Sequence, residues 1–92
     1  MDMTLDHVFI LVKPEAKVAE RLLEQGFREG PRYTHPGQGT AYRRFFFANG
    51  MLELIWVHDA DEARNGPGQN LHFAERAEDP TASPFGIIFV PH

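Results

Sequence analysis

The chain has 92 residues, a formal net charge of −4 and no cysteine. This length allows one small domain, and the absence of cysteine excludes disulfides and thiolate metal sites. The acidic balance argues against binding of nucleic acid, which favours a basic patch. No apolar run approaches the roughly 20 residues that span a bilayer, and the first residues lack the basic and apolar regions of a signal peptide. These features predict a cytoplasmic protein with no membrane or nucleic-acid partner.

Residues 5–12 are rich in β-formers and apolar on both sides, which predicts a strand covered on both faces. His7 lies on the side that also carries Phe9 and Leu11. A histidine in this position is either a satisfied core or edge residue or a group with a function.

A helix should follow this first strand. Pro14 suits the first turn of a helix, and Gly26 suits its left-handed end. Residues 27–34 predict a short second strand, which Gly30-Pro31 interrupts. The apolar stripe of the expected helix consists of Ala16, Ala19, Leu22 and Leu23.

Asn49-Gly50 separates two apolar runs, and this dipeptide is the strongest short-range signal for a two-residue hairpin turn. We expect residues 40–48 and 51–57 to pair as antiparallel strands, with Ala48 opposite Met51. One face of this hairpin has the residues of a main core and should lie under the helix. That face carries Phe45, Phe47, Leu52, Leu54 and Trp56.

The opposite face of the hairpin combines apolar groups with one guanidinium and one carboxylate, which is typical of a pocket wall. It carries Tyr42, Arg44, Phe46, Glu53, Ile55 and Val57.

The remaining segments are shorter. Residues 35–39 form a loop by composition, whose glycines either let the backbone approach a ligand or make an ordinary turn. His35 is expected to be an exposed loop residue. Residues 58–70 are polar, residues 70–78 can form a short helix, and residues 85–90 predict one more apolar strand.

In this order of elements, Leu5-Asp6-His7-Val8 on the first strand and Met51-Leu52-Glu53-Leu54 on the fourth resemble the vicinal oxygen chelate superfamily. That superfamily includes glyoxalase I, ring-cleaving dioxygenases and bleomycin-resistance proteins. The His-Pro-Gly-Gln-Gly-Thr segment at 35–40 is similar to a glyoxalase-like branch of it. The resemblance implies an α+β fold, in which a βαβββ module packs its helix on a mixed, curved sheet. Residues 1–92 would form one such module, with a connector and an extra strand over residues 77–92.

In metal-using members of the superfamily, the histidine of the first strand and the glutamate of the fourth point into a cup. The resemblance therefore implies His7 and Glu53 as metal ligands and Glu53 as a candidate catalytic group. One His and one Glu are half of a typical site for a divalent metal such as Zn, Ni, Fe or Mn. The family's usual chain has two modules, so the resemblance implies either a fragment or a homodimer. A two-fold homodimer would bring these residues of both copies together. In such a dimer, the strand at residues 85–90 could be exchanged or paired between the two copies.

Two classes of function stay open for a small-molecule ligand in such a cup. The first is a metal-dependent lyase, isomerase or dioxygenase, in which the metal acts as a Lewis acid. The second is a metal-free module that binds or sequesters small molecules. Arg44 supports the second class, since it either forms a structural ion pair with Glu53 or holds an anionic ligand. Tyr42 and Phe46 are candidate substrate contacts, or else wall or dimer core.

Overall fold

The computed structural model describes residues 2–91, so Met1 and His92 of the expected 1–92 module lie outside the described residues. The fold class predicted from the sequence, α+β with a mixed and curved sheet, is confirmed. In chain order the elements are β1 (Met3–Leu11), α1 (Ala19–Glu24), β2 (Arg28–Glu29), β3 (Tyr33–His35), β4 (Thr40–Phe47), β5 (Gly50–Val57), α2 (Ala60–Asn65), the 3₁₀ helix η1 (Gln69–Leu71), α3 (Phe73–Glu78) and β6 (Phe85–Pro91).

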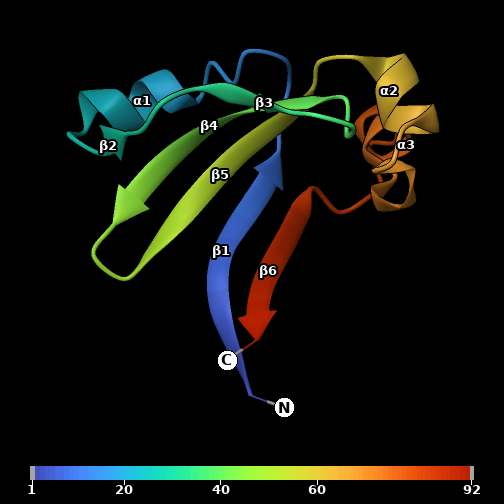
Figure 1. Cartoon of the computed structure of the whole chain (residues 1–92). Coiled ribbons are helices and arrows are strands. Elements are labelled where there is room, and N and C mark those ends of the chain that lie inside the picture. Colours follow the sequence, from blue (N-terminus) through green and yellow to red (C-terminus); the bar gives the residue numbers. More distant parts are fainter. Residues whose placement is uncertain (1, 92) are drawn as a thin grey trace.

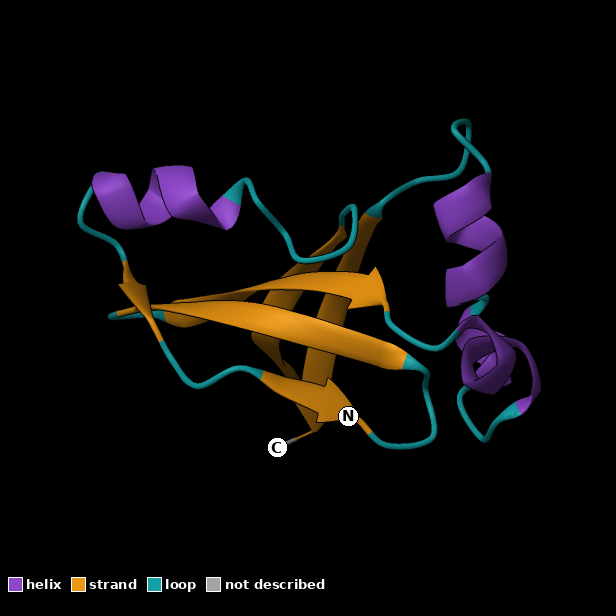
Figure 2. Cartoon of the chain, turned by 90° about the horizontal axis from the view of Figure 1, so that it is seen from above, coloured by secondary structure: helices purple, strands orange, loops and turns teal. Residues whose placement is uncertain are grey.

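The strands form one sheet in the order β2-β4-β5-β1-β6, with β3 also paired to β4. β1 and β5 run parallel, and the other pairs are antiparallel. The sheet is splayed, because the β1–β6 pair turns away from the β4–β5 hairpin (Figure 1). The view from above separates α1 on one side of the sheet from α2 and α3 on the other (Figure 2). β6 pairs with β1 of its own chain.

One face of the sheet packs against α1 and the turn before it, as the sequence predicts. Burial of each large apolar side chain there contributes about 1.5–3 kcal/mol relative to exposure. The prediction that Phe47 and Leu23 belong to the core is wrong, since their side chains are 43% and 37% exposed. The buried cluster consists of Ala16, Ala19, Ala41, Phe45, Leu54 and Trp56.

The helix is shorter than its sequence signals indicate. It begins at Ala19, not in the turn after Pro14. Glu15 and Ala16 adopt positive φ angles of 72° and 47°, which no right-handed helix contains. The carbonyl of Ala16 accepts hydrogen bonds from the Ala19 backbone N–H at 2.8 Å and from Arg43 at 3.4 Å. These bonds fix the residues before α1 as a turn.

The hairpin register also differs from the expected one. Phe47 pairs with Gly50, so the two-residue loop is Ala48-Asn49 and not Asn49-Gly50. None of the loop residues has positive φ, so the turn does not use the special conformation that favours Asn-Gly. The shift of two positions leaves every side chain on its predicted face. It brings Arg44 directly opposite Glu53, which allows these opposite charges to pair.

The polar segment after β5, for which the sequence analysis predicted no helix, contains the helix α2. Asp59 caps it by accepting a hydrogen bond from the Glu62 backbone N–H at 3.1 Å. The next helix, α3, packs on the face of the sheet opposite α1, the concave face. Phe73 of α3 contacts Phe9 edge-on at 5.6 Å and is buried with Ile55. One end of the concave face is therefore filled by the chain itself.

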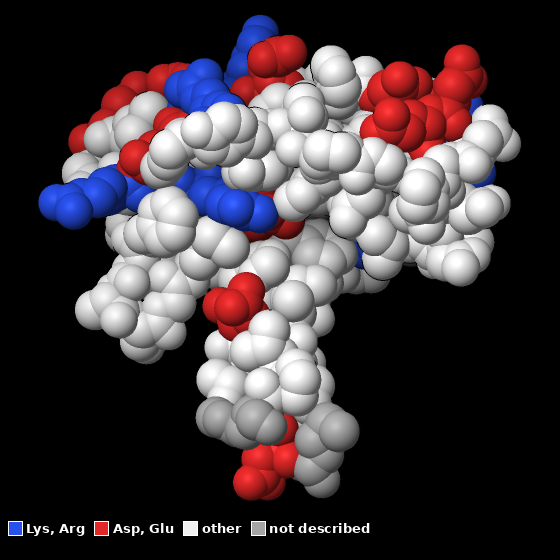
Figure 3. All heavy atoms as spheres, in the orientation of Figure 1, with Lys and Arg blue, Asp and Glu red and all other residues white. Residues whose placement is uncertain are grey.

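The described part of the chain has no helix of the length and apolar character that crossing a bilayer requires. The projecting β1–β6 pair nevertheless exposes apolar side chains. In the space-filling view this pair shows mostly uncharged atoms, whereas the basic side chains gather in the upper part of the molecule (Figure 3). The exposed apolar side chains of β6 on the α1 side of the sheet are Phe85, Ile87 and Phe89, at 61%, 58% and 52%.

Candidate ligand-binding site

Glu53 is the centre of a polar group at the open end of the concave face. It lies in the middle of β5, and its side chain is only 4% exposed. Arg44 Nε donates to Glu53 Oε2 at 2.8 Å, and His35 Nε2 lies 3.3 Å from the same oxygen. His7 Nε2 lies 3.7 Å from the other oxygen, Oε1. We call these four residues the Glu53 cluster.

The four residues come from four strands: His7 from β1, His35 from β3, Arg44 from β4 and Glu53 from β5. β4 places Arg44 across from Glu53, while β1 runs parallel to β5 and presents His7 on the same face. His7 is held from behind, since its Nδ1 lies 2.6 Å from Asp6 Oδ2. The sequence analysis expected His7, Arg44 and Glu53 on one concave face, and the structure brings them together there.

The pKa of Glu53 reflects a balance. Burial of the carboxylate raises its pKa, but the hydrogen bonds and charges of His35 and Arg44 outweigh burial and hold the pKa below its ordinary value. Glu53 is therefore ionised at neutral pH. An ionised carboxylate with a lowered pKa is a weak base and a good acceptor, so its present partners make it well suited to orienting a cation.

His35 is the residue that the sequence analysis missed. It is not an exposed loop residue, because it belongs to β3, pairs with Thr40 and has a side chain that is only 23% exposed. Its ring packs on Tyr42 with centroids 4.6 Å apart. The four-residue connection from His35 to Thr40 is the signal that could have found it, since partners across such a turn point to the same face.

The glycines of this connection serve the packing of the chain. Glu62 Oε1 accepts hydrogen bonds from the backbone N–H groups of Gly37 and Gly39 at 3.0 and 2.9 Å. Gly39 has φ +71°, and a Cβ there would lie 2.2 Å from the Asp59 carbonyl oxygen. The backbone that approaches Gly39 is therefore that of α2. α2 fixes the loop and, through it, His35.

Arg44 has one nitrogen engaged and two that remain available. Its guanidinium carbon lies 3.8 Å from the centroid of the Tyr42 ring, which is buried beneath it. Nε makes the hydrogen bond to Glu53, while Nη1 and Nη2 make none with residues 2–91. The side chain is 27% exposed. Tyr42 and Glu53 therefore fix a guanidinium whose outer edge faces solvent.

Apolar surface adjoins this guanidinium. Phe46 and Met51 form the next pair along the hairpin on the same face, and Phe46 is 45% exposed. Met51 also lines a cleft of about 360 Å³ where the hairpin separates from β1, and His7 lies on its other side. The cleft has the volume of a small-molecule site, but neither Arg44 nor Glu53 is among the residues that line it.

Among the described residues, the side chains that could bind a metal do not make a full set of ligands. Residues 2–91 contain no group of three or more His, Asp or Glu side chains arranged to hold a metal ion. The two imidazoles approach different oxygens of Glu53, and Arg44 lies on one of these oxygens at 2.8 Å. A cation is thus already bonded to the carboxylate that the resemblance assigns to a metal. The expected ligands His7 and Glu53 are near each other but do not form a site by themselves.

The family model of the glyoxalase-like domain matches residues 5–89, which is nearly the whole chain. No curated protein and no solved structure matches it.

Proposed function

Since the chain belongs to the glyoxalase-like domain family of the vicinal oxygen chelate superfamily, a fold that binds small molecules, we propose that its concave face binds a small organic anion without a metal. Arg44 holds the anionic group through Nη1 and Nη2. Phe46 and Met51 contact the apolar body of the ligand. Glu53 and Tyr42 keep the guanidinium in place.

The observation that carries this proposal is the contact between Arg44 and Glu53. A guanidinium fixed on one side by a buried carboxylate and below by an aromatic ring has lost much of its freedom before a ligand arrives. Such pre-organisation lowers the entropic cost of binding, and two parallel N–H donors match a carboxylate. The negative charge of Glu53 is balanced by Arg44, and the nearby carboxylate of Asp6 is bonded to the far nitrogen of His7. Both carboxylates beside an arriving anion are therefore already paired.

Removing the guanidinium should therefore weaken binding selectively. We expect wild type to bind phenylacetate more tightly than its neutral analogue phenylacetamide. Arg44→Ala should lower phenylacetate affinity about 10- to 100-fold, because hydrogen bonds to charged groups are worth about 1.5–3 kcal/mol. Calorimetric titration measures both ligands, and circular dichroism checks the fold. Arg21→Ala, an exposed arginine of α1, is the matched control, and equal affinity for acid and amide would contradict the proposal.

A metal-dependent lyase, isomerase or dioxygenase is the second candidate, and the two imidazoles within 3.7 Å of Glu53 favour it. It needs further ligands, which a second copy of the chain could supply. Titration with Zn, Ni, Fe and Mn distinguishes the candidates. Metal binding that is lost in both His7→Ala and Glu53→Gln would replace the metal-free proposal.

The same proposal includes a homodimer that pairs through β6. This strand lies at the edge of the sheet, so one row of its backbone groups has no strand partner, and its face on the α1 side is apolar. Exposed apolar faces and open strand edges are typical of association sites.

Wild type should sediment as a dimer at micromolar concentration. Ile87→Lys places a charge in the middle of the apolar face and should give a monomer. Val90→Lys is the control, because Val90 is also exposed but lies on the opposite face of β6. A wild-type chain that stays monomeric would refute this part of the proposal.

A further inference from the structure

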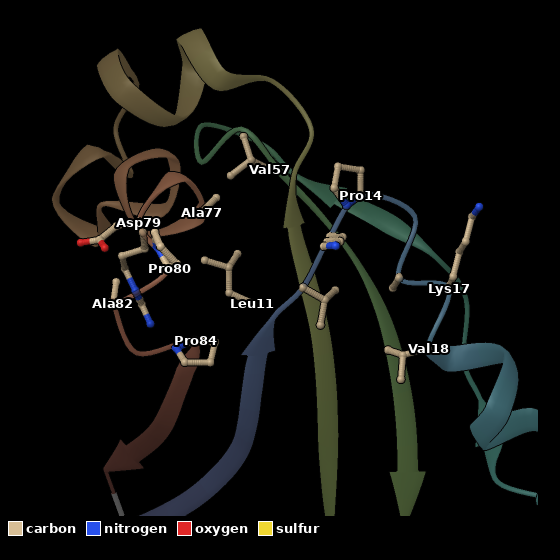
Figure 4. A pocket seen from close by; sticks show the side chains of 14 residues that line it. Leu11, Pro14, Lys17, Val18, Val57, Ala77, Asp79, Pro80, Ala82 and Pro84 are labelled. Atoms are coloured by element: carbon tan, nitrogen blue, oxygen red, sulfur yellow. The ribbon is translucent and has the colours of Figure 1, made fainter.

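A second cavity lies away from the Glu53 cluster, at the other end of the strands. It has a volume of about 840 Å³ and opens between the turn that follows β1 and the segment from α3 to β6. Figure 4 shows Leu11 and Val57 from the strands and Pro80 and Pro84 from the C-terminal segment around this space, with Lys17 at the opposite margin. The cavity is therefore an apolar groove that two separate parts of the chain enclose.

The groove carries a basic rim. The chain has two lysines, Lys13 and Lys17, and both line this one cavity. Neither forms an ion pair with residues 2–91. The turn that carries them passes through positive φ at Glu15 and Ala16, a conformation that these residue types rarely adopt. This turn brings both lysines to the margin of the same groove.

The other charges at the groove do not neutralise the lysines. Arg76 donates to the backbone carbonyls of Ser83 and Phe85, at 2.9 and 3.2 Å. It is a third cation at the groove, and it pairs with no carboxylate of residues 2–91. The carboxylate of Asp79 accepts hydrogen bonds from the backbone N–H and hydroxyl of Thr81, at 2.8 and 2.6 Å. It is thus directed to its own connector. An apolar groove with an excess of unpaired cations complements a ligand with an apolar chain and a negative head.

We propose that this groove binds a single-chain amphiphile with an anionic headgroup, such as an alkyl carboxylate. The alkyl chain lies against Leu11, Val57 and Pro84, and Lys13 and Lys17 hold the headgroup. This site is separate from the Glu53 cluster, and the proposal does not rest on the function given to that cluster.

Titration followed by backbone amide NMR tests the groove, with decanoate, decan-1-ol and acetate as probes. Decanoate should shift amides of residues 11–18 and 76–84 and bind at least tenfold more tightly than decan-1-ol or acetate. Lys13→Gln/Lys17→Gln should lower decanoate affinity at least tenfold, to the level of the alcohol. Lys13→Arg/Lys17→Arg should retain binding, which separates a loss of charge from a loss of fold.

Arg21→Gln is the control for loss of an exposed positive charge elsewhere, and Arg44→Ala should leave decanoate binding at the groove unchanged. This second control keeps the outcome independent of the concave-face proposal. Equal binding of decanoate to wild type and to Lys13→Gln/Lys17→Gln would overturn the proposal. Binding to anionic vesicles without binding of monomeric decanoate would also overturn it, since it would show a membrane surface as the partner.

Discussion

Replacement of Arg43 by alanine should lower the free energy of unfolding by about 3–5 kcal/mol, the usual loss when one partner of a buried ion pair is removed. Arg43 is 2% exposed and lies under α1. It holds Glu29 with two hydrogen bonds, from Nε at 3.0 Å and from Nη2 at 2.7 Å, and contacts Glu20 at 2.9 Å. Without it the Glu29 carboxylate, itself only 9% exposed, keeps Arg32 as its single cationic partner. Urea denaturation measures the loss.

The control for this prediction removes both buried charges. Arg43→Met/Glu29→Leu replaces the pair with apolar side chains and should be much closer to wild type than Arg43→Ala, since such replacements are often neutral. A double variant as unstable as Arg43→Ala would show that the cost comes from lost packing and not from the unpaired carboxylate.

The same pair makes stability depend on pH in a defined direction. The hydrogen bonds of Arg43 are the main cause that holds the pKa of Glu29 below its ordinary value of 4.5, against the effect of burial. A lowered folded-state pKa means that this stabilisation is fully present above pH 4.5 and is lost as the pH falls through the lowered value. The difference between wild type and Arg43→Met/Glu29→Leu should therefore change only in that acidic range.

The general fold was readable because strand periodicity is local. Side chains alternate along a strand, so both faces of the hairpin were assigned correctly even though the register was wrong by two positions. The predicted register was based on the preference of Asn-Gly for a hairpin turn. The observed turn lies one residue earlier, and only this register places Arg44 opposite Glu53. The predicted helix was longer than α1, because its apolar spacing did not indicate that Ala16 lies in a turn. In that turn the Ala16 carbonyl accepts a hydrogen bond from Arg43. α2 carried a readable signal, since Asp59 and Glu62 have the spacing of a helix cap.

The candidate site was predictable only in part. The resemblance and the alternation along the strands placed His7, Glu53 and Arg44 on one face. His35 was missed because the short connection to Thr40 was interpreted as a loop and not as a turn between paired strands. What holds this turn in place is a long-range contact, the hydrogen bonds of Glu62 to Gly37 and Gly39. The sequence also did not predict that Phe73 fills part of the concave face. Phe73 is far from Phe9 and Ile55 in the sequence, although it packs with them in the fold. Contacts of this kind leave no local pattern.

Glu53→Ala should have the second large effect, a loss of about 1–3 kcal/mol in the free energy of unfolding. It removes the carboxylate that the part-buried Arg44 guanidinium and the two imidazoles share. Glu53→Gln keeps the shape and an acceptor oxygen, so it should cost less. Both variants should also weaken phenylacetate binding, although Glu53 does not touch the ligand in the proposed arrangement, since Arg44 is no longer held in place. Urea denaturation and calorimetry give the two readouts separately.

A double-mutant cycle of Glu53→Ala and Arg44→Ala decides whether this holding is real. If Glu53 acts through Arg44, the double variant should bind phenylacetate no more weakly than Arg44→Ala alone, and its stability should be higher than the two single losses predict by about 0.5–3 kcal/mol, the usual coupling of residues in contact. The Arg43 pair on the opposite face should show no such coupling to ligand binding. Losses that simply add, in stability and in affinity, would show that Glu53 and Arg44 act independently, and Glu53 would then have to contact the ligand itself.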